Sequence, residues 1–160
     1  MWYAILAAGL TAVDQLVKHL VRVHIPEGGS VPFLPGVLDL TCFRNTGAGF
    51  SILAGHTWLL TVISAVLSVL LALALWKNFF RRPAGKTALA LLLAGAVGNL
   101  IDRAVFGGVT DMFRTLFISF PVFNVADICV TAGGILAAVY YLFFYEKLEG
   151  KRDEHPDADG

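Results

Sequence analysis

The chain has few charged residues and almost no cysteine. Of its 160 residues only 15% are charged, whereas a typical soluble domain has about 25%, and the apolar residues stand in long blocks. The 12 basic and 12 acidic residues cancel, so net charge gives no reason to expect a nucleic-acid partner. The two cysteines, Cys42 and Cys129, have no disulfide-framework or zinc-ligand spacing. This composition indicates a membrane protein.

Four apolar runs are each long enough to cross a bilayer as a helix, which takes about 20 residues. The first run is not expected to be a cleaved leader, because no basic residue precedes it and Asp14 and Lys18 interrupt it. We therefore predict an all-α polytopic membrane protein with one domain over residues 1–146 and a polar tail over 147–160. The predicted spans are residues 2–21, 58–76, 87–106 and 122–145.

The connections between the runs carry weaker signals. Residues 37–43, between Pro35-Gly36 and a following turn, predict a strand in a small outer sheet. Apolar residues between the third and fourth runs have helical spacing and predict a short helix in the membrane interface, with a plain hydrophobic connection as the alternative. These residues are Met112, Phe113, Leu116, Phe117 and Phe120.

Basic residues in the short connections predict the orientation of the chain. The link 77–86 holds four Lys and Arg residues and the tail holds three, whereas segments 22–57 and 107–121 hold two and one. We expect both termini on the cytoplasmic side. The polar ends of the third and fourth helices then lie near the outer face.

Polar residues gather at those helix ends. A carboxylate at the centre of a membrane helix costs roughly 2.5–3.5 kcal/mol and is tolerated mainly where it meets a partner or lines a cavity. Asn99 shares a helix face with Asp102 and Arg103, and Asn124 shares one with Asp127. The two faces can therefore line one cavity.

Glycines on the third and fourth helices indicate where these helices approach each other. Small residues let helix backbones pack closely in a membrane. Gly95, Gly98, Gly133 and Gly134 have this property, although ordinary packing also accounts for them.

Two of the acids have local structural explanations. Asp14 lies four residues before Lys18, so a helical ion pair explains it as well as substrate contact does. Asp102 adjoins Arg103, and we interpret these two mainly as a structural pair at the end of the third helix.

The other two acids are candidates for chemistry. Asp127 has no basic residue within four positions and is the hardest to explain as structure. Asp111, with Arg114 three residues on, is either a solvated loop acid or a partner of Asp127, and spacing does not choose. Two carboxylates held close share a proton, so one can act as base and the other as acid on a peptide bond. That chemistry needs no metal or cofactor.

Other functions have less support. The chain has no HExxH, GxSxG or GxGD signature, which disfavours metallopeptidase, serine hydrolase and presenilin-like chemistry. The main alternative is a small proton or cation transporter component that uses Asp14, Asp102 and Asp127. A purely structural membrane partner leaves Asp127 unexplained.

Five short segments occur in order on the four-span frame. They are Val13-Asp14-Gln15 with Lys18, Arg44-Asn45-Thr46-Gly47-Ala48-Gly49-Phe50-Ser51, Gly98-Asn99-Leu100-Ile101-Asp102-Arg103, Val109-Thr110-Asp111-Met112-Phe113 and Phe123-Asn124-Val125-Ala126-Asp127. Together they resemble the lipoprotein signal peptidase family, also called signal peptidase II or prolipoprotein signal peptidase. The resemblance covers the whole chain except the tail.

The resemblance implies that Asp111 and Asp127 are the catalytic pair of an intramembrane aspartic peptidase. It also implies supporting or substrate-binding roles for Asp14, Asn45, Asn99, Asp102, Arg103 and Asn124. The implied fold has four transmembrane helices, a small extracytoplasmic sheet and a short interfacial helix.

The implied substrate is a diacylglyceryl-modified prolipoprotein, cut just before its lipid-bearing cysteine. The resemblance further implies a monomer in contact with lipid in the bacterial cytoplasmic (inner) membrane, and inhibition by globomycin.

Overall fold

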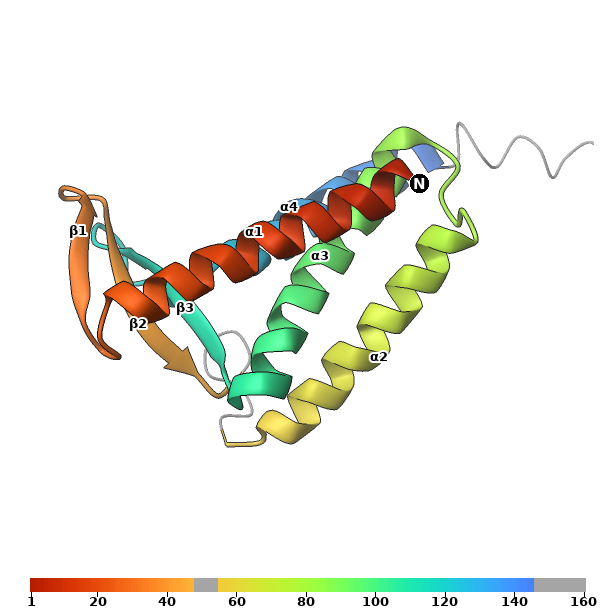
Figure 1. The fold of residues 1–160 in the computed structure, drawn as a ribbon. Helices are drawn as coiled ribbons and strands as arrows, with labels where there is room; N and C mark the ends of the chain where they lie inside the picture. Colours follow the sequence, from red (N-terminus) through yellow and green to blue (C-terminus); the bar gives the residue numbers. More distant parts are fainter. Residues whose placement is uncertain (48–54, 146–160) are drawn as a thin grey trace, which may run out of the picture.

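The structure is a computed structural model that describes residues 1–47 and 55–145. Figure 1 shows a bundle of long helices with a small sheet at one end. The helices are α1 (Trp2–His24), α2 (Thr57–Trp76), α3 (Pro83–Phe106) and α4 (Val125–Tyr140), followed by the π-helical turn η2 (Tyr141–Tyr145). The strands are β1 (Ser30–Leu34), β2 (Leu38–Asn45) and β3 (Val109–Thr115). The predicted tail, and residues 48–51 of the second motif, lie outside the described residues.

All four predicted spans are helices long and apolar enough to cross a membrane. α3 begins at Pro83, earlier than predicted, because proline lacks the N–H that the first helical position leaves unpaired. It ends at Gly107, whose φ of 69° is a left-handed conformation that glycine adopts easily. α4 begins later than predicted, at Val125, because the side chain of Asn124 caps it.

α3 is the central helix of the bundle. It contacts α1, α2 and α4, while α2 packs mainly on α3 (Figure 1). Added Cβ atoms would meet Asp14 Oδ2 at 2.6 Å from Gly98, the α4 backbone from Gly95, and Leu92 N at 2.9 Å from Gly133. The prediction of close helix approach is confirmed at these three glycines. It is wrong for Gly134, where the added atom meets nothing within 4 Å.

The sheet is antiparallel in the order β1-β2-β3, and it confirms the strand predicted over residues 37–43. The short interfacial helix predicted over Met112–Phe120 is wrong, because its first half forms β3. β3 pairs with β2 along one edge, and the N–H groups of Met112 and Phe113 donate to the carbonyl of Phe123. Met112 is fully buried against Val21 and Cys42, so tertiary pairing and burial decided the conformation.

Candidate active site

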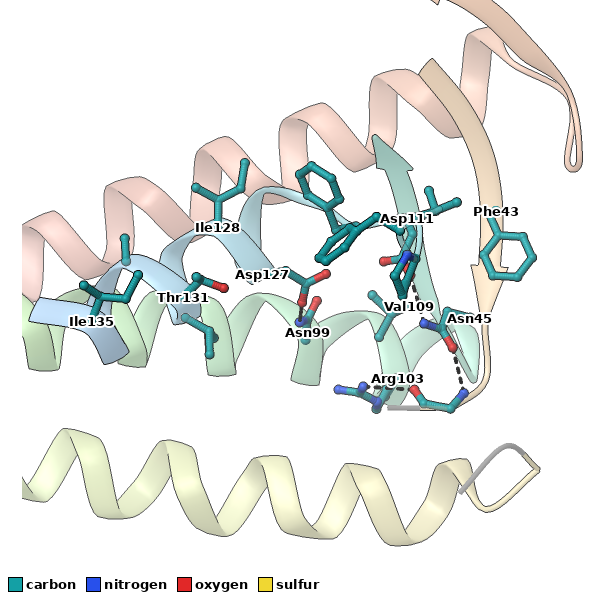
Figure 2. A pocket seen from close by; sticks show the side chains of 17 residues that line it. Phe43, Asn45, Asn99, Arg103, Val109, Asp111, Asp127, Ile128, Thr131 and Ile135 are labelled. Atoms are coloured by element: carbon teal, nitrogen blue, oxygen red, sulfur yellow. Dashed lines mark hydrogen bonds between the residues drawn. The ribbon is translucent and has the colours of Figure 1, made fainter. Parts of the chain in front are cut away.

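A cavity of about 910 Å³ lies where the sheet meets α3 and α4. Its polar wall carries Asn99, Asp111 and Asp127, and an apolar wall follows α4 (Figure 2). The residues that line it are Phe43, Asn45, Gly47, Asn99, Arg103, Val109, Asp111, Phe120, Pro121, Val122, Phe123, Asp127, Ile128, Val130, Thr131, Ala132 and Ile135.

Asp127 is held by the first turn of α4. Asn124 is the N-cap, and its side-chain oxygen accepts from the backbone N–H of Asp127 at 2.9 Å. In return Oδ2 of Asp127 accepts from the backbone N–H of Asn124 at 3.2 Å, which completes a reciprocal capping box. Oδ1 of Asp127 accepts from Nδ2 of Asn99 on α3 at 2.9 Å. Asn99 lines the cavity with Asp127, as predicted, whereas Asn124 is fully buried and is not among the lining residues.

Asp111 reaches the same cavity from β3. It is 2% exposed, and its oxygens accept from Nδ2 of Asn124 at 2.6 Å and from Nδ2 of Asn45 at 2.9 Å. Figure 2 shows the contact with Asn45. Burial raises the pKa of Asp111 from 3.8 to about 6; Asp127 raises it further, while the amides of Asn45 and Asn124 oppose the increase. The interpretation as a solvated loop acid is wrong, since Arg114 pairs with Asp39 at 2.7 Å instead.

Asn124 links the two acids. Its Nδ2 contacts Asp111, while its backbone N–H and side-chain oxygen both contact Asp127. Asp111 on β3 and Asp127 in the first turn of α4 are 16 positions apart along the chain, and both contact Asn124. Spacing left the partner of Asp127 open, and the structure brings Asp111 to it.

A buried charge cluster supports the site from the side of α1. The predicted ion pair of Asp14 and Lys18 is confirmed at 2.9 Å, and both side chains are buried. Asp14 Oδ1 also accepts from the backbone N–H of Ala126 at 2.8 Å, which ties α1 to the start of α4.

The predicted pair of Asp102 and Arg103 is wrong. Asp102 faces α1, where Arg22 Nη1 lies 3.5 Å and Lys18 Nζ 3.7 Å from its Oδ2, and it accepts from the backbone N–H of Thr110 at 2.8 Å. Neighbouring residues on a helix point in different directions, so adjacency in sequence does not bring them together.

Arg103 lies on the cavity wall instead (Figure 2). Its Nη1 donates to Ser64 Oγ at 3.3 Å and its Nη2 to the carbonyl of Gly47 at 3.4 Å. Its buried Nε has no hydrogen-bond partner among the described residues. The guanidinium therefore keeps donor capacity next to the cavity.

Sequence reasoning missed the part that Lys18 and Arg22 play. Lys18 entered only as the local partner of Asp14, yet its Nζ also donates to Oδ1 of Asn99 at 2.9 Å. Arg22 donates to Oγ1 of Thr110 at 2.8 Å and lies 4.2 Å from the ring centre of Phe106. The sequence did carry a signal for this role, because Lys18 and Arg22 lie four positions apart on one face of the otherwise apolar helix α1. Among the described residues, no group of three or more His, Cys, Asp or Glu is placed to hold a metal ion.

Comparisons with known proteins agree with this architecture. The family model described as "Signal peptidase (SPase) II" matches residues 6–143. Lipoprotein signal peptidase of Brevibacillus brevis is 41% identical over 143 residues, covering 89% of this chain and 96% of the relative. Lipoprotein signal peptidase of Enterococcus faecalis is 40% identical over 151 residues, covering 93% of each.

Solved structures give the same result. A bacterial membrane enzyme determined by the in meso method at 2.3 Å resolution superposes with a TM-score of 0.82 at 29% identity, covering 97% of this chain and 94% of that one. A second, at 1.9 Å resolution, gives 0.80 at 31% identity, covering 89% and 93%.

The fold and its four membrane helices define a multi-pass bacterial membrane enzyme. The family match over most of the chain makes that enzyme a peptidase. The chain belongs to the signal peptidase II family, whose curated members are lipoprotein signal peptidases.

Proposed function

We propose that the chain is an aspartic endopeptidase that removes signal peptides from diacylglyceryl-modified prolipoproteins, cutting before the lipid-bearing cysteine. The observation that carries the proposal is the meeting of Asp111 and Asp127 at one cavity in a chain of this family. The two acids come from different elements and share a contact with Asn124. A purely structural explanation accounts poorly for two acids on one cavity wall, since neither has an ion-pair partner among the described residues.

Two carboxylates at one cavity can divide acid and base work between them. The ionised carboxylate takes a proton from a water molecule as the water oxygen attacks the scissile carbonyl carbon. The protonated carboxyl donates a hydrogen bond to the developing oxyanion, and the amine then leaves with a proton from the pair. Asp111, with a pKa of about 6, is poised to share a proton near neutral pH. The shared proton belongs to the pair, because coupled groups titrate as a unit.

The cavity also suits a lipidated peptide. Its volume is near the upper end of small-molecule pockets, which span about 300–1,000 Å³. Ile128, Val130 and Ile135 on α4 line the cavity and form an apolar wall for acyl chains. Figure 2 shows Ile128 and Ile135 on this wall, with Asp111 and Asp127 at the polar end. The donor groups of Arg103 and Asn45 are positioned to hold the peptide backbone above the scissile bond.

The proposed arrangement in the cell follows the distribution of basic residues. Both termini lie in the cytoplasm, and the acid pair lies near the outer face of the inner membrane, where a lipid-modified precursor presents its cleavage site. The enzyme works as a monomer in contact with lipid, and globomycin occupies the same cavity.

A cleavage assay in reconstituted lipid tests the proposal. A diacylglyceryl-modified precursor is incubated with the parent chain, with Asp111→Asn and with Asp127→Asn, and the released leader peptide is measured. Each variant should lose activity by about 10²–10⁴-fold or more, the contribution of a positioned acid or base. Asp39→Asn is the matched control, since this sheet acid pairs with Arg114 away from the cavity and its loss should leave cleavage intact. Parental activity in either Asp111→Asn or Asp127→Asn would refute the acid pair.

The alternative of a proton or cation transporter has no support. Asp111 lies on β3 and Asp127 in the first turn of α4, so the acid pair is at the sheet end of the bundle, and α2 carries no charged residue that could continue a path. The relatives reported above are lipoprotein signal peptidases.

A further inference from the structure

The amides beside the acid pair can each lie in two orientations, and only one of them is useful. An asparagine side chain donates through nitrogen and accepts through oxygen. In the structure the nitrogens of Asn99 and Asn124 face Asp127 and Asp111, at 2.9 Å and 2.6 Å. Turned about, an amide oxygen that faces an ionised carboxylate would have no hydrogen between the two oxygens, and the ionised form would lose a hydrogen-bond donor. The site therefore needs something that selects the orientation.

Lys18 has the required chemistry. An ammonium can only donate hydrogen bonds, and Nζ of Lys18 lies 2.9 Å from Oδ1 of Asn99. The oxygen of Asn99 must face Lys18, so its nitrogen must face Asp127. The same oxygen accepts from Nδ2 of Asn124 at 3.2 Å. The orientation of Asn124 agrees with this and is also held by the backbone N–H of Asp127, which donates to its oxygen.

We propose that Lys18 is a positioning residue for the acid pair: its buried ammonium fixes the orientation of the Asn99 amide, so that Asn99 donates to Asp127 and its oxygen accepts from Asn124. This inference rests on the proposed function of Asp111 and Asp127. Lys18 itself does not line the cavity, and it acts through Asn99.

Burial makes this control strong. Lys18 is 0% exposed, Asn124 is 0% exposed and Asn99 is 9% exposed, so water has little access to compete for these hydrogen bonds. Other charged groups around Lys18 are Asp14 on its own helix and Asp102 on α3, with Arg22 on the far side of Asp102. On the remaining elements, Asp127 on α4 and Asp111 on β3 interact electrostatically with Lys18, and Arg103 on α3 lines the cavity that holds these two acids.

A structural role for Lys18 must be separated from a positioning role. Lys18→Met alone removes one of two positive charges that balance Asp14 and Asp102, and that imbalance can unfold the chain by itself. The double variant Asp14→Asn with Lys18→Met keeps the cluster neutral, because Arg22 still balances Asp102. Its new amide oxygen at position 14 can still accept from the N–H of Ala126, as the carboxylate does now.

The double variant is compared with the parent in the cleavage assay, per mole of folded enzyme, over a range of pH. We expect kcat to fall about 100-fold, as on loss of one acid-base contribution, with KM near the parental value. The acidic limb of the kcat profile should move to higher pH, because an Asn99 amide that Lys18 no longer holds can turn away, and the ionised acid pair then loses a hydrogen-bond donor that favours its charged form. Thr11→Val is the control: it removes another contact of α1 with α3, to the carbonyl of Ala94, and should not move the profile.

A second comparison asks whether Lys18 acts through Asn99. Starting from Asn99→Leu, adding the double substitution should cost little further kcat, because the amide that transmits the effect is already gone. An equal fold loss in both backgrounds would overturn the inference, as would a double variant with parental kcat and pH profile.

Failure of the inference is distinct from failure of the proposed function. If Asp111→Asn and Asp127→Asn are inactive while the double variant keeps the parental profile, only the role of Lys18 is wrong. If either single acid variant keeps parental activity, the proposed function itself is wrong.

Discussion

Asp102→Asn tests the buried charge cluster on which the site rests. The Asp102 side chain is 0% exposed, lies 3.5 Å from Arg22 and 3.7 Å from Lys18, and accepts from the backbone N–H of Thr110. The substitution keeps the shape of the side chain and removes its negative charge. Two positive charges then have only Asp14 to balance them.

The expected cost follows from burial. Breaking a buried ion pair by removing one partner costs about 3–5 kcal/mol. The amide oxygen of the variant can still accept from Thr110, and Lys18 keeps Asp14, so we expect the lower end, about 3 kcal/mol. For a chain of this length that corresponds to a Tm lower by about 6–12 °C.

Thermal unfolding in detergent micelles measures this loss, and the cleavage assay measures activity per mole of folded enzyme. Activity should fall far less than in Asp127→Asn, since Asp102 does not line the cavity. Asp39→Asn is the matched control, because the Asp39 and Arg114 side chains are 15% and 45% exposed. Such a pair contributes at most about 1 kcal/mol. Equal losses of Tm in the two variants would refute the argument from burial.

Further predictions concern the pH response and the packing of the bundle. With a pKa of about 6, Asp111 should show a protonated carboxyl band by infrared spectroscopy at pH 5 that disappears above pH 7 and is absent in Asp111→Asn. Because the pKa of Asp111 is higher in the folded chain than 3.8, protonated Asp111 stabilises the fold. This stabilisation is complete below pH 3.8 and is lost as pH rises through 6, and unfolding curves measured between these pH values check the sign. Asn45→Ala should move the band to still higher pH, because the Asn45 amide favours the charged form. Gly98→Ala should lower stability by about 1–3 kcal/mol, since its Cβ would meet Asp14 Oδ2 at 2.6 Å, whereas Gly134→Ala should be neutral or stabilising. Equal Tm values for the two alanine variants would contradict the packing argument.

The helices were predictable because long apolar runs have one stable form in lipid. Asn99 and Asp127 could be assigned to facing helices for the same reason, from their places at the ends of two runs. The position of Asp111 could not be derived from spacing, because it depends on the pairing of β3 with β2 and Phe123. The family resemblance supplied that partner.

The partners that the buried charged residues have on other helices could not be predicted from the sequence either. Asp102 was assigned to its neighbour Arg103, but its ion-pair partners, Lys18 and Arg22, lie on α1, more than 70 residues earlier. Local spacing found Asp14 with Lys18 because both lie on one helix. It could not find Lys18 with Asn99, since only the packing of α1 on α3 brings them together.

The reciprocal cap at the start of α4 has a consequence for the order in which the molecule becomes competent. Asp127 acquires its two hydrogen bonds to Asn124 only when α4 has formed its first turn. The ribosome synthesises β3 before α4, so a nascent chain contains Asp111 before Asp127 is in place. Under the proposed mechanism, a nascent chain therefore cannot cleave a substrate before α4 has formed its first turn.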